Sequence, residues 1–378
     1  MPRTRTYILL CLLLQCSITY TTHAQEKRSV WTPEQANNWY VQQPWIVGCN
    51  FIPSTAINQL EMWQATTFDT ATIDKELGWA QGLGMNSVRV FLHHLAYLND
   101  PKGLIQRMDI FLQIASRRHI KPLFVLFDSC WDPNPQAGQQ QEPRPRVHNS
   151  HWVQSPGAHD LKDRTRYPAL EKYVKGVITP FANDSRILGW DIWNEADDNN
   201  AGNYDKEELP NKTAYVLPLL KNAFAWARAA NPTQPLTACV WQPKGNWGNI
   251  DSLSAIEMVA LTQSDIITFH CYRNGPAEME KRIRWLQGYH KPVMCTEYMA
   301  RTIGSTFEAC LPLLKKYHAG AFNWGLVEGK TNTIYPWDSW RTTYTDEPPL
   351  WFHDIFRKDG TPYKDEEVML IRQLTAKP

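Results

Sequence analysis

The sequence predicts an α/β fold in which eight parallel strands close into a barrel that is surrounded by helices. Short apolar runs alternate with amphipathic stretches from about residue 45 to about residue 325. The apolar runs are continuous, as in parallel strands that are buried on both faces. No glycine-rich GxGxxG turn follows the first run, which argues against a doubly wound nucleotide-binding sheet. Eight strands therefore favour the (β/α)8, or TIM, barrel.

Each predicted strand is followed by a connection that reaches the next one. The strands are expected at Ile46–Asn50, Ser87–Phe91, Pro122–Phe127, Leu188–Trp193, Leu236–Trp241, Ile266–Cys271, Val293–Thr296 and Ala319–Trp324. Apolar residues recur at three- and four-residue intervals between them, which predicts helices at Ile73–Leu83, Leu104–Arg118, Leu170–Phe181, Leu217–Ala230, Ala277–Tyr289 and Phe307–Tyr317. No low-complexity linker divides the chain, so we expect one barrel domain over residues 25–378.

The first residues have the features of a secretory signal peptide. Arg3 and Arg5 give a basic start, Tyr7 to Leu14 form a short apolar core, and Thr22-His23-Ala24 offers a small-residue cleavage site. The apolar core is too short to span a bilayer. We therefore predict that residues 1–24 are a signal peptide and that the mature protein is secreted or periplasmic.

The composition is that of an ordinary globular protein with balanced charge. Hydrophobic residues make up 43% of the chain, and 39 Lys and Arg face 38 Asp and Glu. Such a balance gives no field that would attract nucleic acid or a membrane surface. We expect a monomer with no nucleic-acid partner and no membrane span. A lipoprotein anchor at Cys16 is not expected, because Gln15 occupies the place where a small residue is needed.

Six cysteines follow the predicted cleavage site, namely Cys49, Cys130, Cys239, Cys271, Cys295 and Cys310. Most lie in apolar strand-like runs, where a free thiol packs as a small hydrophobic group. If His270 and Glu297 face the barrel interior, strand alternation places Cys271 outside and Cys295 inside, so these two cannot pair. We expect buried free thiols, with at least one disulfide as the alternative. No CxxC or CxH spacing indicates zinc.

Two glutamates at predicted strand ends carry the functional prediction. Glu195 follows Asn194 at the end of the apolar run Ile187–Trp193, and Glu297 ends the run Lys291–Thr296. Parallel barrel strands deliver side chains from their carboxyl ends into one mouth. Two carboxylic acids in such a mouth are the equipment for hydrolysis of a glycosidic bond.

Other polar and indole residues fall at the ends of the remaining strands. Indoles stack on the apolar faces of sugar rings, while amides, carboxylates and imidazoles bind hydroxyls. Glu61 and Trp63 lie in the loop after the first strand and are candidate sugar contacts. The full set of expected substrate-binding residues is Arg89, Asn194, His270, Tyr272, Trp324, Trp241, Asp128, Trp131, Glu61 and Trp63.

A long insertion follows the third strand. Residues 128–168 are rich in Pro, Gln, His and Trp, and a loop of that length in a compact domain is usually functional or mobile. Because it leaves a carboxyl strand end, it must lie over the catalytic face. We expect Trp131 or Trp152 to stack on bound sugar. The later stretch 331–351 has a similar composition.

The fourth-strand segment Trp190-Asp191-Ile192-Trp193-Asn194-Glu195 resembles the signature of the cellulase-like clan of retaining glycoside hydrolases, above all family 5. The resemblance extends to Arg89, His270-Cys271-Tyr272, Thr296-Glu297 and Trp324, in the family's order. It spans roughly residues 45–325.

The resemblance implies a role for each of these residues. Glu195 would be the general acid/base and Glu297 the nucleophile, and no cofactor or metal would be needed. Asn194 would bind the sugar 2-hydroxyl, His270 and Tyr272 would position the nucleophile, and Arg89 would hold its charge. Two departures bear on sugar specificity. Ala196 replaces a frequent proline, and the usual third-strand histidine is absent where Phe127-Asp128-Ser129-Cys130-Trp131 stands.

Three functions remain open at this point. The favoured one is a retaining β-glycosidase that acts on a plant-type β-glycan or a derived oligosaccharide. The second is a non-catalytic carbohydrate-binding barrel that kept the aromatic residues. The third is a metal-dependent polysaccharide deacetylase that uses Asp128, His148 and His151, and chelators would inhibit it.

Overall fold

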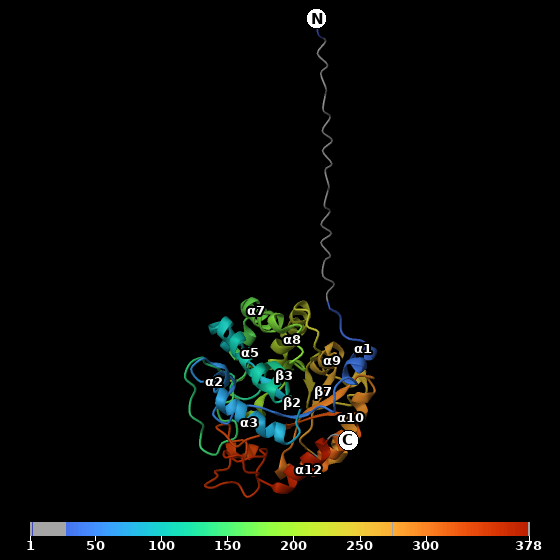
Figure 1. The fold of residues 1–378 in the computed structure, drawn as a ribbon. Coiled ribbons are helices and arrows are strands. Elements are labelled where there is room, and N and C mark those ends of the chain that lie inside the picture. The colour runs from blue at the N-terminus through green and yellow to red at the C-terminus, as the bar shows by residue number, and fades with distance from the viewer. Residues whose placement is uncertain (1, 3–27, 274, 377–378) are drawn as a thin grey trace.

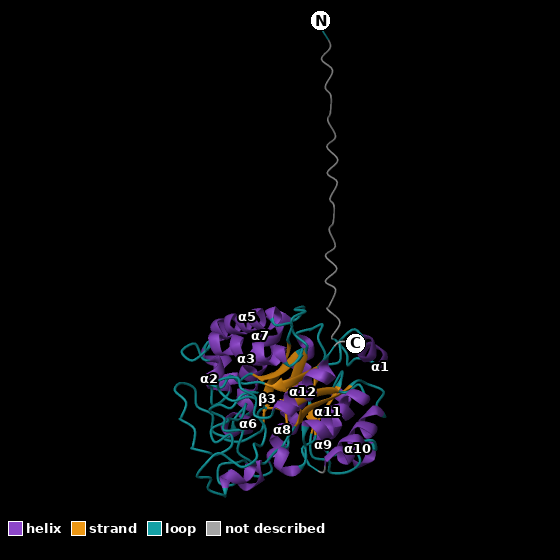
Figure 2. Ribbon diagram, turned by 60° about the horizontal axis from the view of Figure 1, so that its bottom comes forward, coloured by secondary structure: helices purple, strands orange, loops and turns teal. Residues whose placement is uncertain are grey.

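The computed structural model describes residue 2 and residues 28–273 and 275–376. Apart from residue 2, the predicted signal peptide lies outside these residues. Within them, a barrel of strands fills the centre and helices surround it (Figure 1 and Figure 2). No helix in this part of the chain is both long and apolar enough to cross a membrane.

Each strand of the central sheet runs parallel to the strands with which it is hydrogen-bonded. The strand order is β5-β4-β3-β2-β1-β9-β8-β7-β6. β5 and β6 are two halves of the predicted fifth strand, separated at Ala238, whose N–H donates to the Ser264 hydroxyl. The predicted barrel of eight strand positions is thereby confirmed. The strands are β1 (Val47–Asn50), β2 (Ser87–Phe91), β3 (Lys121–Asp128), β4 (Gly189–Asn194), β5 (Leu236–Thr237), β6 (Cys239–Val240), β7 (Ile267–His270), β8 (Val293–Tyr298) and β9 (Gly320–Trp324).

The six predicted helices are present, with bounds shifted by a few residues. The structure has α1 (Pro33–Tyr40), α2 (Gln59–Trp63), α3 (Thr70–Gly82), α4 (His94–Asn99), α5 (Pro101–Arg117), α6 (Ala158–Lys162), α7 (Tyr167–Ile178), α8 (Lys212–Ala229), α9 (Ala255–Gln263), α10 (Gly275–Gln287), α11 (Phe307–Lys316) and α12 (Asp365–Thr375). The periodicity of apolar residues did not predict α1, α2, α4, α6, α9 or α12. Of these, α1 and α9 each begin with a capping box. Its Ser/Thr-x-x-Glu/Gln pattern is a local feature that apolar spacing does not detect.

The barrel interior is apolar at its amino end and polar at its carboxyl end. Leu123, Leu188 and Met294 belong to a buried cluster with Ile46, Ile266 and Phe322, and Ala36 and Tyr40 of α1 join the same cluster. The close packing at the amino end of the barrel excludes water and fixes the strands. Polar side chains such as Arg89 and His270 are therefore held at the carboxyl end, where the strands continue into loops.

β8 contains one extra residue, which changes the direction of its later side chains. Phe269 of β7 pairs with Cys295, but the next residue, His270, pairs with Glu297. This β-bulge leaves Thr296 as the inserted residue. Cys295 belongs to the cluster between barrel and helices, together with Cys271 and Cys310. The prediction that Cys295 faces inward is therefore wrong, because simple alternation ignores the bulge.

The expected free thiols are confirmed. All six cysteines between residues 28 and 376 are free; five are buried and Cys130 is partly exposed. Burial raises the pKa of the Cys49 and Cys295 thiols, so these groups stay protonated and unreactive.

The long loop after β3 and the loop after β9 are bonded to each other above the barrel. His148 N–H donates to the Ser339 hydroxyl at 3.0 Å, and the Trp340 indole N–H donates to the His148 carbonyl at 2.7 Å. The Trp131 ring stacks on Trp340 with centroids 5.3 Å apart and planes inclined by 12°. We call residues 128–168 and 331–351 the joined loops. They lie over the catalytic face, as the sequence predicted.

Trp152 differs from Trp131 in its surroundings. Its side chain is 2% exposed, its indole N–H donates to Asp128 at 2.7 Å, and its ring meets Phe91 and Trp324 edge-on. The expectation that Trp152 serves mainly to stack on sugar is corrected: this indole supports the loop from below. Trp131 is partly exposed and remains available to a ligand.

These surroundings predict unequal effects on stability. Trp152→Ala should lower the free energy of unfolding by about 3–5 kcal/mol, because it leaves a cavity and removes one hydrogen bond from a buried carboxylate. Trp131→Ala should cost about 1 kcal/mol, as expected for a partly exposed ring. Urea titrations followed by tryptophan fluorescence measure both values. Equal losses in the two variants would contradict this distinction.

Candidate active site

The two predicted catalytic glutamates meet at the carboxyl end of the barrel. Glu195 directly follows β4, and its φ of 43° lies in the left-handed region. Its backbone N–H donates to the Cys239 sulfur at 3.2 Å. One carboxyl oxygen each of Glu195 and Glu297 and a ring nitrogen of His270 all lie within 4.8 Å of one another. Strained backbone of this kind is found where a side chain must be aimed.

Glu297 is surrounded by donors. Arg89 Nη1 donates to Oε1 at 2.7 Å, and the Tyr272 hydroxyl donates to Oε2 at 2.8 Å. Burial raises the pKa of Glu297 to about 7, while Arg89 and Tyr272 act in the opposite direction. Donors of this kind stabilise the ionised form. Of the two glutamates, Glu297 is thus the one that loses its proton first.

Glu195 has weaker support for a negative charge. His270 Nδ1 lies 2.7 Å from Oε1, and the Cys130 thiol donates to Oε2 at 3.4 Å. Burial, followed by the charges of Glu297 and Asp198, raises the pKa of Glu195 well above its usual range. Burial also lowers the pKa of His270 well below its usual range, so this imidazole is neutral. At neutral pH the proton of the pair therefore lies on Glu195.

Arg89 connects Glu297 with the floor of the site. The guanidinium is 0% exposed. Nε and Nη2 donate to Asp191 Oδ2 at 2.9 and 2.8 Å, and Nη1 donates to Asn50 Oδ1 at 2.9 Å. Nη2 also donates to Asn194 Oδ1 at 2.7 Å. The predicted role of Arg89 at the nucleophile agrees with this geometry.

Asp128 is a positioning residue, which corrects its prediction as a sugar contact. The carboxylate is 1% exposed. Oδ1 accepts from Asn194 Nδ2 at 2.9 Å, and Oδ2 accepts from Gln59 and Trp152 at 3.1 and 2.7 Å. Both oxygens are thus occupied by protein donors, and Asp128 fixes the amide of Asn194 from below.

The loop after β1 does not supply the predicted sugar contacts. Trp63 is 0% exposed, and its indole N–H donates to the Phe91 carbonyl at 2.8 Å. The prediction for Trp63 is wrong, because this indole belongs to the core between barrel and helices. Glu61 binds the Lys330 ammonium at 2.8 Å and the Ile57 N–H at 2.7 Å, so its carboxylate links two loops instead.

Partly exposed aromatic rings surround the two glutamates. Trp324 ends β9 and meets Phe91 edge-on, with ring centroids 5.8 Å apart. Trp337 meets Tyr272 edge-on at 5.2 Å and is a site residue that the prediction did not name. Trp241 donates its indole N–H to Asp197 at 2.7 Å. These rings provide flat apolar surfaces beside the reacting groups.

The arrangement that a deacetylase would need is not formed. His148 is 1% exposed and donates from Nδ1 to the Tyr335 carbonyl at 2.8 Å. Burial lowers its pKa to about 4. Within residues 28–273 and 275–376, Asp128, His148 and His151 are not among the clusters whose ligand-type atoms lie within 4.8 Å of one another.

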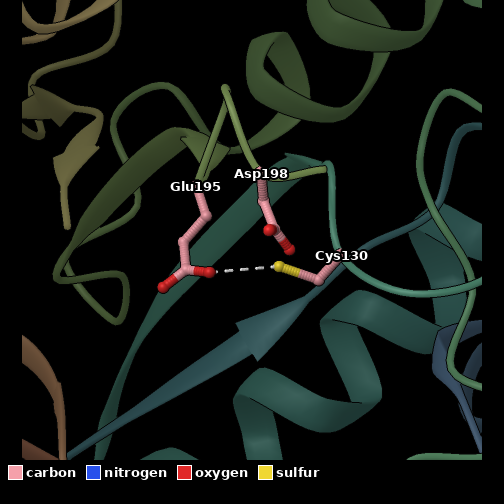
Figure 3. Close-up of side chains that lie close together, drawn as sticks. All are labelled: Cys130, Glu195 and Asp198. Atoms are coloured by element: carbon pink, nitrogen blue, oxygen red, sulfur yellow. Dashed lines mark hydrogen bonds between the residues drawn. The ribbon is translucent and has the colours of Figure 1, made fainter. Parts of the chain in front are cut away.

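Two further residues lie beside Glu195 and were not predicted. Cys130, Glu195 and Asp198 place one sulfur and two carboxyl oxygens within 4.8 Å of one another (Figure 3). Cys130 stands in the segment where the third-strand histidine of the related signature is missing. That departure was the only local indication of a changed environment, whereas nothing in the sequence pointed to Asp198.

Comparison with known sequences agrees with this geometry. The sequence profile described as "Cellulase (glycosyl hydrolase family 5)" matches residues 53–329. The chain belongs to glycosyl hydrolase family 5. The matched range contains both glutamates and runs from the loop after β1 to the loop after β9. A search of curated proteins found no match.

Solved structures with the same fold include several family 5 enzymes of low sequence identity. An exo-β-1,4-mannosidase from an Opitutaceae bacterium is 16% identical with a TM-score of 0.57, over 87% of this chain and 59% of that one. An endo-1,4-β-D-mannanase from Thermotoga petrophila is 16% identical with a TM-score of 0.52, over 87% and 99%. A β-mannanase from the blue mussel Mytilus edulis is 16% identical with a TM-score of 0.54, over 82% and 94%. The present chain thus spans 59% of the mannosidase. At these identities the likeness shows the fold.

The donors around Glu297 lead to a prediction for pH dependence. Tyr272→Phe removes a hydrogen bond that favours the ionised nucleophile, so the pKa of Glu297 should rise. If Glu297 acts as the nucleophile that the resemblance implies, it must be ionised, so the acidic limb of the kcat/KM profile should move to higher pH by about 1 unit. The profile of the variant on an aryl glycoside measures this shift. An unchanged acidic limb would show that Tyr272 does not support the nucleophile's charge.

Proposed function

We propose that the protein is a retaining glycoside hydrolase that cleaves β-glycosidic bonds in a plant-type β-glycan or a derived oligosaccharide. The observation that carries this proposal is the unequal support of two adjacent carboxyl groups. Glu297 is bound by a buried guanidinium and a phenol, while Glu195 is bound by a neutral imidazole and a thiol. One group is prepared to attack and the other to donate a proton.

The first step transfers the sugar to the protein. The Glu297 carboxylate attacks the anomeric carbon and forms a glycosyl ester, while the bond from that carbon to the leaving oxygen breaks. The proton of Glu195 passes to the leaving oxygen. A separation of about 5–5.5 Å between the two carboxyl groups leaves no room for water at the attack position. One carboxyl oxygen of Glu195 lies within 4.8 Å of one of Glu297, which supports this close arrangement.

The second step releases the sugar. Glu195, now ionised, takes a proton from a water molecule, whose oxygen attacks the anomeric carbon as the ester bond breaks. Glu297 leaves as a carboxylate and Glu195 is again protonated, so both groups return to their starting forms. Two inversions at the same carbon retain the β configuration.

The joined loops support action at a chain end. One of these loops follows β3 and the other follows β9, and they are hydrogen-bonded to each other. Because β2 and β1 lie between β3 and β9 in the sheet, the joined loops cover this side of the barrel mouth. Glu195 protonates the leaving group from the β4 side, so the retained sugar lies toward the joined loops. A wall on that side leaves room for a terminal sugar unit. The mannosidase and mannanases that share the fold make β-mannosides the first substrates to test. We place this activity outside the cytoplasm, since the N-terminal sequence resembles an export signal.

The assigned roles predict opposite behaviour of two variants. Glu195→Ala should still react with a dinitrophenyl β-glycoside, because its leaving group needs no proton, and added azide should accelerate the second step. Glu297→Ala should lose about 10⁴-fold or more in activity on the same substrate, because no ester can form. Stopped assays of dinitrophenol release measure both. If both variants lost the same activity and azide rescued neither, the roles assigned to Glu195 and Glu297 would be wrong. If the wild-type protein were inactive, the carbohydrate-binding alternative would be favoured.

Proton NMR of the first minutes of hydrolysis tests stereochemistry and chain-end action together. From a β-linked oligosaccharide we expect a β-anomer before mutarotation, and a monosaccharide as the first small product. An α-anomer appearing first would exclude double displacement. Products of mixed length from the start would be compatible with the retaining mechanism but would contradict the role of the joined loops as a wall.

A further inference from the structure

The environment of the acid/base contains two groups whose roles the double-displacement scheme leaves open. The Cys130 sulfur accepts a hydrogen bond from Asn194 Nδ2 at 3.3 Å, and its thiol donates to Glu195 Oε2 at 3.4 Å. The sulfur therefore stands between the amide beside the nucleophile's arginine and the acid/base. Figure 3 shows this contact as the dashed line.

The Asp198 carboxyl group lies close to the same sulfur. Its side chain points toward Cys130 from the loop after β4, and its N–H donates to the Glu195 carbonyl at 2.8 Å (Figure 3). The single thiol hydrogen thus faces two carboxyl groups. Hydrogen bonding to Cys130 and the charge of Lys212 lower the pKa of Asp198, but burial outweighs both and brings it to about 6. Asp198 is therefore ionised in the neutral range.

We propose that Cys130 and Asp198 are positioning residues for the acid/base, the thiol steadying the ionised form of Glu195 and the Asp198 carboxylate favouring its protonated form. This inference rests on the proposed retaining mechanism, in which Glu195 must give up a proton in one step and recover one in the next. Glu195 passes through both the protonated and the ionised form, so it benefits from one neighbour that stabilises each form.

The thiol is suited to this position because it is a weak donor. Burial and the surrounding carboxylates raise the pKa of Cys130 well above its usual range, so the sulfur keeps its hydrogen while the glutamates titrate. When Glu195 is ionised, the S–H group points to Oε2. When Glu195 is protonated, the same hydrogen serves Asp198. A stronger donor in this place would hold Glu195 ionised and oppose the first step.

Other titratable and charged groups lie around the Glu195 carboxyl group, and a test must leave each of them unchanged. Glu297 and His270 face it from β8 and β7, Cys239 from β6, and Asp128 from β3. Arg89 acts on the pair through Glu297. The substitutions Cys130→Ala and Asp198→Asn leave all these groups in place, and Asn keeps the size of Asp.

The experiment measures the pH dependence of kcat/KM on a β-glycoside with a poor leaving group. The basic limb of that profile reports the loss of the Glu195 proton. Cys130→Ala removes a donor to the ionised form, so the limb should move to higher pH by about 0.5–1 unit. Asp198→Asn removes a neighbouring negative charge, so the limb should move to lower pH by a similar amount, about 0.5–1 unit. Cys130→Ser keeps a donor, so its limb should lie at lower pH than that of Cys130→Ala.

Matched substitutions control for general effects. Cys310→Ala makes the same change in a buried thiol of α11, and Asp205→Asn makes the same change on an exposed residue of the Glu195 loop. Neither should move the basic limb. A second readout is the leaving group: Cys130→Ala should slow a poor leaving group about tenfold, and the deficit should nearly vanish with dinitrophenol, which departs without a proton.

Shifts of opposite sign support the proposal, whereas unmoved limbs or shifts in the same direction overturn it. Absence of hydrolysis by the wild-type protein would instead overturn the proposed function. In that case carbon-13 NMR of glutamate-labelled protein, with Glu195→Gln to assign the signal, follows the same titration without turnover. Unchanged titration of Glu195 in both variants would then reject the positioning roles directly.

Discussion

A single buried guanidinium holds the functional end of the barrel together. Arg89 reaches from β2 to Asn50 on β1, Asp191 and Asn194 on β4, and Glu297 on β8. Removing such a charge from water is costly, and it is tolerated because charged and amide oxygens meet its donors. The strands that surround the two glutamates are thereby fixed relative to one another by one side chain, and loss of Asp191 or Glu297 would remove a charged acceptor from the buried guanidinium.

The division of labour between the two glutamates follows from their neighbours and not from their depth. Both carboxyl groups are buried, and burial alone raises the pKa of each. The difference is that a cation and a phenol hydrogen-bond to Glu297, whereas no cation among the residues that the structure describes hydrogen-bonds to Glu195. The neutral state of His270 matters here, since a protonated imidazole at 2.7 Å would stabilise a charge on Glu195. Charge separation within the pair is thus built into the fold.

The sequence predicted the barrel and its central chemistry because both depend on short-range patterns. Continuous apolar runs locate strands, and a polar residue at the end of a run must enter the barrel mouth. The prediction failed where a long-range contact decides the outcome. Trp63 and Trp324 are both indoles near strand ends, yet only the fold shows that helix α2 turns Trp63 into the core. Asp128 lies at a strand end as expected, but its two oxygens are taken by partners from distant segments.

Asp198 illustrates a different difficulty. It follows Glu195 by three residues in a loop that has no periodic pattern, so its position beside the acid/base depends on the left-handed backbone at Glu195. No composition rule expresses that turn. Cys130 was visible only as a departure from a related signature, and its meaning required the distances to Glu195 and Asn194.

The bulge in β8 separates two duties along one strand. Before Thr296 the strand follows the barrel's regular register, and its side chains serve packing alone; after it, Glu297 is turned into the mouth. If Thr296 paired with His270 in regular register instead, inside and outside would exchange beyond it and Glu297 would point into the layer of helices. The bulge itself is therefore more constrained than the identity of most residues in β8. Cys295 or Met294 can be replaced by other apolar residues, provided that the bulge is kept.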